Sequence, residues 1–235
     1  MTSSQEHSDE IERIMREYER RTNELDPGFY SLSKAANLFT RQSQVRAIAG
    51  ALRRAGKMPL SSYDVLDVGC GRGDWLTEFE LLGAARARLH GIELVPDFAR
   101  VAQARLPGTH IVNGDAASLP WKNHAFDVVF QSTVFTSILD ASVKNQIAAE
   151  MRRVLRPGGI VLWYDFTYDN PKNKSVKGVG RGEIKKLFPG ATFHFERTTL
   201  APPIARRLVD RSWTLAFLLE NVRALNTHCL ATIQY

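Results

Sequence analysis

The chain has little of what marks disulfide-stabilised, zinc-binding or membrane-spanning proteins. Its two cysteines, Cys70 and Cys229, are far apart and lack the spacing of metal ligands, which excludes a disulfide framework or a zinc site. The first ten residues are polar and contain no apolar signal-peptide segment. The longest strongly apolar stretch, residues 213–219, is too short to cross a bilayer. We therefore expect a cytoplasmic protein without a membrane-inserted segment.

The composition is that of an ordinary globular protein with an uneven charge. With 235 residues, 44% hydrophobic and 24% charged, the chain is long enough for one α/β domain with a full core. The net charge is +6, and the basic residues gather in two segments. These residues are Lys172, Lys174, Lys177, Arg181, Lys185 and Lys186, followed by Arg197, Arg206, Arg207 and Arg211. They could attract an acidic substrate, nucleic acid or anionic lipid, or they form a solvated basic face.

Apolar periodicity predicts an N-terminal helical region followed by an α/β domain. Residues 1–24 and about 32–55 have helical spacing, so we expect a helical cap over 1–56 and a second region over 57–235. The second region alternates strands and helices, which is typical of a parallel sheet covered on both faces. The expected strands are residues 64–68, 89–93, 110–112, 126–130 and 160–164, with helices at 75–82, 98–105 and 143–155.

The last quarter of the chain has a different pattern. We expect a short helix at 182–188, a strand at 192–198, one helix at 204–222 and a closing strand at 228–234. The apolar residues of the 204–222 helix are expected in the core, with an acceptor-pocket wall as the alternative. These residues are Ile204, Leu208, Trp213, Leu215, Phe217 and Leu218.

The strongest motif is the sequence Asp67-Val68-Gly69-Cys70-Gly71-Arg72-Gly73 after an apolar strand. Glycines let a backbone turn sharply and let a ligand approach closely, although ordinary turns also use them. Glu93 ends the second strand and could accept hydrogen bonds from both hydroxyls of a ribose. Asp115 follows the third strand and could accept from an adenine amino group. All three features fall at carboxyl ends of strands, where open α/β sheets bind ligands.

The glycine spacing separates two kinds of nucleoside ligand. Dinucleotide-dependent oxidoreductases use G-x-G-x-x-G, whereas this loop reads G-x-G-x-G and has Asp74 where the third glycine would stand. The acidic Asp67 also precedes the loop. The pattern therefore favours an adenosine with a charged amino-acid tail over a pyrophosphate.

These residues resemble the class I S-adenosylmethionine (SAM)-dependent methyltransferases, in particular the UbiE-like group of small-molecule enzymes. The resemblance covers about residues 63–165 and includes Leu119-Pro120-Trp121 and Arg156-Pro157-Gly158-Gly159. It implies an α/β, Rossmann-like, doubly wound seven-stranded sheet of order 3-2-1-4-5-7-6 with the seventh strand antiparallel. It also implies that SAM is bound by Asp67, Gly69, Cys70, Gly71, Gly73, Glu93, Leu94, Asp115, Ala116 and Gln131.

Residues for the acceptor are harder to identify. None of the six histidines, His7 in a flexible N-terminus among them, lies where a base is needed, so each is interpreted as structural. Asp165 and Tyr164 follow the fifth strand, where Asp165 could orient or deprotonate an acceptor or simply form a turn. The substrate-contacting candidates are Tyr18, Tyr30, Ser132, Thr136, Tyr168 and Arg181, for which packing is the alternative.

The motifs together predict SAM-dependent methyl transfer to a small-molecule or sugar-containing acceptor, with oxygen as the favoured acceptor atom. The basic segments would suit an acidic acceptor. Metal-dependent relatives carry an aspartate just after the fourth strand, and Gln131 in that position favours a metal-independent reaction. A tRNA or rRNA methyltransferase is the first alternative, although Gln131-Ser132-Thr133-Val134 replaces the amino-methylation motif of such enzymes. A non-catalytic SAM-binding protein is the second. The expected assembly is a monomer or a homodimer.

Overall fold

The fold centres on a seven-stranded mixed sheet in the computed structural model, which describes residues 3–24, 26, 28–169 and 173–235. The strand order is β3-β2-β1-β4-β5-β7-β6, with β7 antiparallel to both of its neighbours. This confirms the predicted topology. The strands are β1 (Val65–Val68), β2 (Leu89–Glu93), β3 (His110–Asn113), β4 (Phe126–Ser132), β5 (Leu155–Phe166), β6 (Thr192–Leu200) and β7 (Asn226–Gln234).

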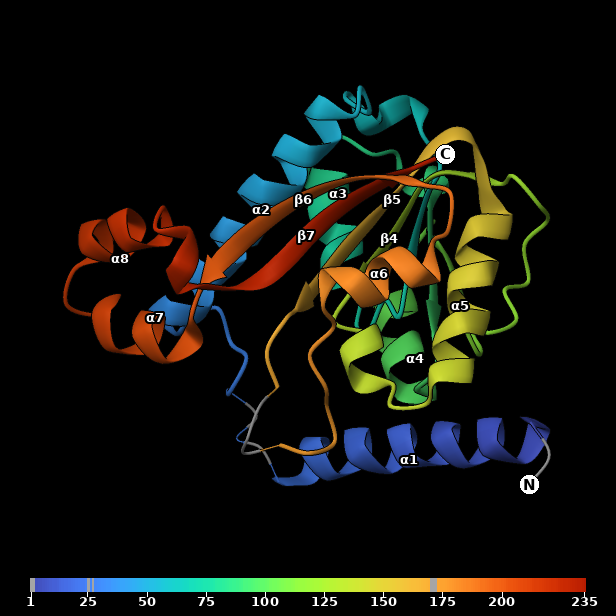
Figure 1. Cartoon of the computed structure of the whole chain (residues 1–235), viewed down its shortest axis with the longest axis horizontal. Helices are drawn as coiled ribbons and strands as arrows, with labels where there is room; N and C mark the ends of the chain where they lie inside the picture. The colour runs from blue at the N-terminus through green and yellow to red at the C-terminus, as the bar shows by residue number, and fades with distance from the viewer. Residues whose placement is uncertain (1–2, 25, 27, 170–172) are drawn as a thin grey trace.

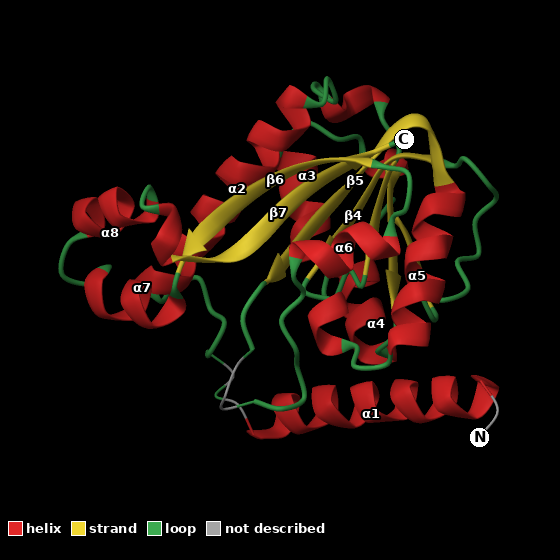
Figure 2. Cartoon of the chain, viewed as in Figure 1, coloured by secondary structure: helices red, strands yellow, loops and turns green. Residues whose placement is uncertain are grey.

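Helices cover both faces of the sheet (Figure 2). Val65 and Val128 point to one face and pack with residues of α2 (Ala35–Arg54), α3 (Asp74–Leu81) and α4 (Pro96–Arg105). Val129 and Val161 point to the other face and pack with α5 (Ala141–Val154) and α6 (Arg181–Leu187). Because side chains alternate along a strand, the continuous apolar runs of the central strands supply both cores. Four short 3-10 helices complete the connections: η1 (Leu60–Ser62), η2 (Arg86–Arg88), η3 (Phe135–Ser137) and η4 (Arg223–Leu225).

The first helix, α1 (Ser3–Glu24), runs along the carboxyl ends of the parallel strands (Figure 1). Its buried Glu10 accepts a hydrogen bond from the Leu139 amide at 2.5 Å, and Arg13 donates to the Ser137 carbonyl at 2.6 Å. The predicted helix is confirmed over residues 3–24. The expectation that His7 lies in a flexible terminus is wrong, because His7 is inside α1 and bonds to Asp115.

The second helix, α2, shares its core with the sheet. Ile48, Ala51 and Leu52 are buried in the same apolar cluster as Val65 and Val128. Residues 35–54 therefore pack as part of the α/β layer, while α1 is attached to the edge of the sheet. The division of the chain at residue 56 stays a prediction.

The segment between β6 and β7 differs from the prediction. The single helix expected at 204–222 is wrong: two helices, α7 (Pro202–Leu208) and α8 (Trp213–Glu220), are separated by a turn. Ser212 begins α8 by accepting a hydrogen bond from the Leu215 amide at 3.2 Å, which is a typical N-terminal cap. The core assignment is also wrong for four residues of α8, since all four are exposed: Trp213, Leu215, Phe217 and Leu218. None of the helices in the described ranges has the length and apolar content needed to cross a membrane.

Candidate functional site

The glycine-rich loop between β1 and α3 has a left-handed backbone. Gly69, Gly71 and Gly73 have φ angles of +74°, +57° and +82°, which strain any residue with a Cβ. A Cβ at Gly69 would lie 2.5 Å from Val134, and one at Gly73 would lie 2.8 Å from Leu106. At Gly71, apart from the glycine and its two chain neighbours, no atom of the described residues lies within 4 Å of the position that a Cβ would take. Gly69 and Gly73 thus allow close packing, whereas Gly71 leaves open space beside the loop.

Glu93, at the end of β2, is fixed against this loop. It is buried, and its two carboxylate oxygens accept hydrogen bonds of 2.8 Å from the Gly71 and Val95 amides. Burial raises the pKa of Glu93, and these two amides act in the opposite direction. A carboxylate has about four acceptor positions, so two remain for further donors. The predicted ribose acceptor therefore has the chemistry that a pair of hydroxyls requires.

Asp67 lies beneath the loop near a cation that the sequence did not reveal. Burial and the neighbouring Glu93 raise the pKa of Asp67 well above its usual range, while Arg41 of α2 lowers it. The Arg41 guanidinium lies 4.7 Å from the centre of the Trp75 ring, and its Nη1 atom is buried without a hydrogen-bond partner among the described residues. No motif marks Arg41, because only the packing of α2 on the sheet brings it to the loop.

The adenine side of the predicted site is in contact with α1. One carboxylate oxygen of Asp115 accepts from the Ala117 amide at 2.9 Å, and the other lies 2.5 Å from Nε2 of His7. Leu94 and Ala116, the other predicted adenine neighbours, are half-buried and pack against the core. His7 thus already bonds to the Asp115 carboxylate, which we predicted to accept a hydrogen bond from an adenine amino group.

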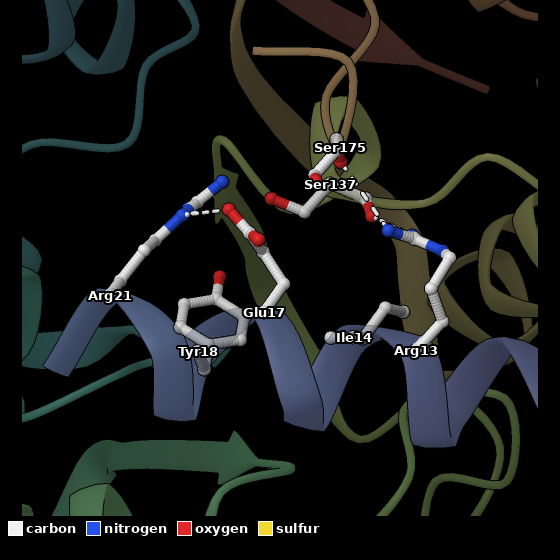
Figure 3. A pocket seen from close by; sticks show the side chains of 7 residues that line it. All are labelled: Arg13, Ile14, Glu17, Tyr18, Arg21, Ser137 and Ser175. Carbon is white, nitrogen blue, oxygen red and sulfur yellow. Dashed lines mark hydrogen bonds and ion pairs between the residues drawn. The ribbon is translucent and has the colours of Figure 1, made fainter. Parts of the chain in front are cut away.

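The space between α1 and the sheet edge is narrow. A pocket of about 160 Å³ is lined by α1 residues, including Arg13 and Tyr18, together with Ser137 and Ser175 (Figure 3). Pockets for ligands of drug size usually measure roughly 300–1,000 Å³. By the same measure of empty space, a more open groove of about 1170 Å³ lies between α1 and the start of α4. The residues at the loop fit SAM, and α1 contacts the adenine side of this site through His7 and Asp115.

Asp165 forms a buried polar network with β4 and η3. Its carboxylate accepts hydrogen bonds from Gln131 Nε2 at 3.0 Å and from Thr136 Oγ1 at 2.8 Å. All three side chains are fully buried. Burial raises the pKa of Asp165 to about 7, although both hydrogen bonds act to lower it. Gln131 also accepts from the Val134 amide at 3.1 Å, so the network fixes the turn that packs over Gly69.

Tyr164 points to the opposite face of the sheet from Asp165, as alternation along β5 requires. Its hydroxyl is buried and bonded to Gln44 at 2.9 Å and to Thr199 at 2.7 Å. This environment gives Tyr164 a packing role between α2, β5 and β6. Cys70 is similarly turned inward, because its sulfur packs against Gly91 of β2.

The predicted acceptor residues are spread over the sheet edge. Tyr18 lines the small pocket, and Ser132 ends β4 half-buried beside the Asp165 network. Tyr30 and Tyr168 are exposed, and the Tyr168 hydroxyl accepts a hydrogen bond from Arg197 at 2.6 Å. The Arg181 guanidinium lies over the Phe195 ring of β6. Because β6 is the third strand from β4 in the sheet, this contact is roughly 14 Å from the end of β4. Lys172 of the basic segment lies outside the described residues.

The comparisons with known proteins agree with this geometry. Residues 65–159 match the family model described as a methyltransferase domain, a range that contains the loop, Glu93, Asp115 and Gln131. Over this range the chain matches a methyltransferase domain, and its fold is that of solved SAM-dependent methyltransferases. The predicted membership of the UbiE-like group is supported by similarity to the ubiquinone/menaquinone biosynthesis C-methyltransferase UbiE of Bartonella quintana. That relative is 27% identical over 172 residues, which cover 70% of this chain and 58% of the relative.

Two further relatives of the methyltransferase domain show how far the similarity extends. The phthiotriol/phenolphthiotriol dimycocerosates methyltransferase of Mycobacterium leprae is 35% identical over 141 residues, 56% of this chain and 46% of that protein. The chain therefore spans about half the length of the curated relatives that it matches. A solved SAM-dependent methyltransferase of Thermotoga maritima, described as a possible histamine N-methyltransferase, has a TM-score of 0.60 at 17% identity. It aligns over 95% of this chain and 97% of its own, which confirms the fold.

Proposed function

We propose that this chain transfers a methyl group from SAM to a small-molecule acceptor. The observation that carries the proposal is the state of Glu93, a buried carboxylate held by two backbone amides beside the open space at Gly71. Its remaining acceptor positions suit the two hydroxyls of a ribose. SAM supplies a methyl group on a positively charged sulfur, which is a good leaving group.

The proposed contacts divide SAM into three parts. Glu93 accepts from the ribose, and Asp115 accepts from the adenine amino group once His7 has moved away. Leu94 and Ala116 offer half-buried apolar surface to the adenine ring.

The methionine end lies along the loop. Gly69, Cys70 and Gly71 contribute backbone there, and the unpartnered nitrogen of Arg41 binds the methionine carboxylate. Glu78 Oε1 lies 3.9 Å from Arg41 Nε and balances part of its charge, while Arg41 also acts to lower the pKa of Asp67 that burial raises. Gln131, at the end of β4, faces the reacting end.

For the acceptor, we propose a lipophilic small molecule in preference to a sugar-containing one. The support comes from two relatives. The Mycobacterium leprae enzyme is named for methylation of phthiotriol dimycocerosates, and the Bartonella quintana enzyme is named for ubiquinone/menaquinone biosynthesis. We keep oxygen as the favoured acceptor atom, because Asp165 could take up the proton of a hydroxyl. Carbon is the alternative, since UbiE is named a C-methyltransferase. Gln131 at the strand end favours transfer without a metal.

The proposed proton acceptor is Asp165. As the acceptor oxygen forms its bond to the methyl carbon and the bond from that carbon to sulfur breaks, the hydroxyl proton passes to the Asp165 carboxylate. A pKa of about 7 suits a general base near neutral pH. Because Gln131 and Thr136 cover both oxygens, one of them must turn aside for the acceptor to reach Asp165. If both side chains stay in place, Asp165 cannot contact the acceptor, and its role is to hold the Gln131 side chain in position.

The experiment is a transfer assay with SAM that carries a deuterated methyl group. Quinones, lipid alcohols, sugar nucleotides and total tRNA are incubated separately with the full chain, and products are identified by mass. Transfer to a quinone or lipid class supports the proposal. Transfer to tRNA alone replaces it with an RNA methyltransferase, and SAM binding without transfer to any class favours the non-catalytic alternative.

The role of Asp165 is tested on the same reaction. Asp165→Asn should lower kcat at least about 100-fold if Asp165 is the base, with an unchanged Kd for SAM. The exposed Asp97→Asn is the matched control and should leave kcat unchanged. An unchanged kcat in Asp165→Asn would remove the carboxylate from the reaction.

A further inference from the structure

The helix α8 exposes an unusual amount of apolar surface. Ala216 is its one fully buried residue, and Leu219 packs against the same small core. Trp213 contacts the buried Phe39 ring edge-on at 5.3 Å but keeps 38% of its surface exposed, and Leu215, Phe217 and Leu218 are exposed. The exposed fractions run from 38% to 60% over five residues of α8 and the following turn. These residues are Trp213, Leu215, Phe217, Leu218 and Val222. Isolated exposed leucines are common in soluble proteins, but five within ten positions form a patch that requires an explanation.

Five exposed arginines belong to the same segment or pack on it. Two are in α7, one is in the turn before α8, one is in η4 and one is in α2: Arg206, Arg207, Arg211, Arg223 and Arg46. The Arg206 guanidinium lies 5.5 Å from the centre of the Phe29 ring. The Arg46 guanidinium lies 5.4 Å from the centre of the Phe217 ring and pairs with Glu220 at 2.6 Å. The segment thus presents apolar side chains flanked by positive charges. We call these ten residues, five apolar and five basic, the α7–α8 face.

The α7–α8 face lies at the functional edge of the sheet. Because β5 and β6 are both antiparallel to β7, β6 runs parallel to β5, and α7 begins where β6 ends. The carboxyl ends of β1, β2 and β4, with the glycine-rich loop and Glu93, meet the same edge. Figure 1 shows α7 and α8 projecting beyond the end of the sheet. A surface bound to this face would therefore lie at the side of the molecule where the acceptor must enter.

We propose that the α7–α8 face docks the protein reversibly on an anionic lipid bilayer. Trp213, Phe217 and Leu218 enter the boundary between headgroups and acyl chains, where aromatic and apolar side chains are favourable. The arginines pair with lipid phosphates, and each basic residue near a negatively charged surface strengthens binding about fivefold. This docking goes beyond the proposed methyl transfer and needs no SAM or acceptor.

A second copy of the chain fits the face less well. At roughly 200 Å² for each large side chain, of which about half is exposed, the five apolar residues offer on the order of 500 Å². Standard interfaces bury about 800 Å² on each partner. A twofold dimer would also bring the same arginines against one another, because both copies use one patch. An anionic surface has the opposite charge and no such area requirement.

The experiment measures binding of the full chain to vesicles by sedimentation. Vesicles of phosphatidylcholine alone are compared with vesicles that contain about 30 mol% phosphatidylglycerol, whose anionic headgroups attract basic segments. We expect binding to the anionic vesicles at least tenfold stronger and weakened by salt. Phe217→Asp/Leu218→Asp and Arg206→Glu/Arg207→Glu should each reduce it at least tenfold.

Matched controls separate docking from general charge and folding effects. Arg53→Glu/Lys122→Glu makes the same change in net charge at exposed positions outside the face, and Leu81→Asp places a charge at an exposed leucine of α3. Both controls should bind as the wild type does. Trp213 fluorescence should shift to shorter wavelength with anionic vesicles, and the shift should disappear in Trp213→Phe.

Two results would overturn the proposal. One is equal or absent binding to both kinds of vesicle by a folded wild-type chain. The other is that the wild-type chain does not bind vesicles but dimerises with increasing concentration, and that Phe217→Asp/Leu218→Asp abolishes this dimerisation. That result would assign the face to self-association. If the wild-type chain binds anionic vesicles but transfers no methyl group to any acceptor, the proposed function is contradicted and the docking proposal remains supported.

Discussion

Replacement of Asp165 by asparagine should remove most of one pH-dependent component of stability. The Asp165 carboxyl is fully buried, and its pKa is raised from 3.8 to about 7 because burial penalises the charged form. The folded protein thus binds a proton more tightly than the unfolded chain does. This contribution to stability is complete below about pH 4 and is lost as the pH rises to about 7. A shift of about three units corresponds to at most about 4 kcal/mol.

The structure allows asparagine to replace the protonated form with little rearrangement. Its carbonyl oxygen can accept from Gln131, and its amide can donate to Thr136, whose hydroxyl already lies 3.2 Å from the Thr133 carbonyl. Urea unfolding at pH 4, 5, 6, 7 and 8 gives the free energy of unfolding. We expect the wild type to lose several kcal/mol relative to Asp165→Asn over this range, and Asp97→Asn to follow the wild type. Parallel curves for the wild type and Asp165→Asn would refute the reasoning.

Three further changes test the site. His7→Ala should tighten SAM binding two- to fivefold, because it removes a partly exposed pair that occupies Asp115; weaker binding on calorimetric titration would show instead that α1 holds the ligand. Arg41→Gln should weaken SAM binding at least about tenfold but leave the binding of methylthioadenosine, which lacks the carboxylate, unchanged; equal losses for both would contradict the assignment. Gly73→Ala should lower the free energy of unfolding by about 1–3 kcal/mol, since its Cβ meets Leu106 at positive φ; an unchanged urea midpoint would disprove this.

The sheet and the cofactor loop could be predicted from the sequence because each depends on local patterns. Apolar runs ending at Val68 and Glu93, with glycines between them, determine a strand, a turn and a ligand edge within thirty residues. The closing strand β7 was also recognised, since residues 228–234 follow a strand-like pattern.

The rest depends on contacts between distant segments. Arg41 and Asp67 are 26 positions apart, and His7 reaches Asp115 from the other end of the domain, so neither pair leaves a motif. The exposure of Leu218 was missed for a related reason: apolar composition does not show whether another element covers a helix. The turn between α7 and α8, by contrast, has a local signal that the prediction of a single helix overlooked. Ser212 stands before an apolar run, which is typical of an N-terminal cap.

The central claim is that Glu93 and the glycine-rich loop bind SAM, and calorimetric titration of the full chain with SAM tests it most directly. The wild type should bind SAM at micromolar concentration. Glu93→Gln should bind about 10- to 100-fold more weakly, because a charged acceptor of ribose hydroxyls is lost, and Asp97→Asn should bind as the wild type does. Absence of binding at millimolar SAM, or equal affinity in Glu93→Gln, would contradict the account.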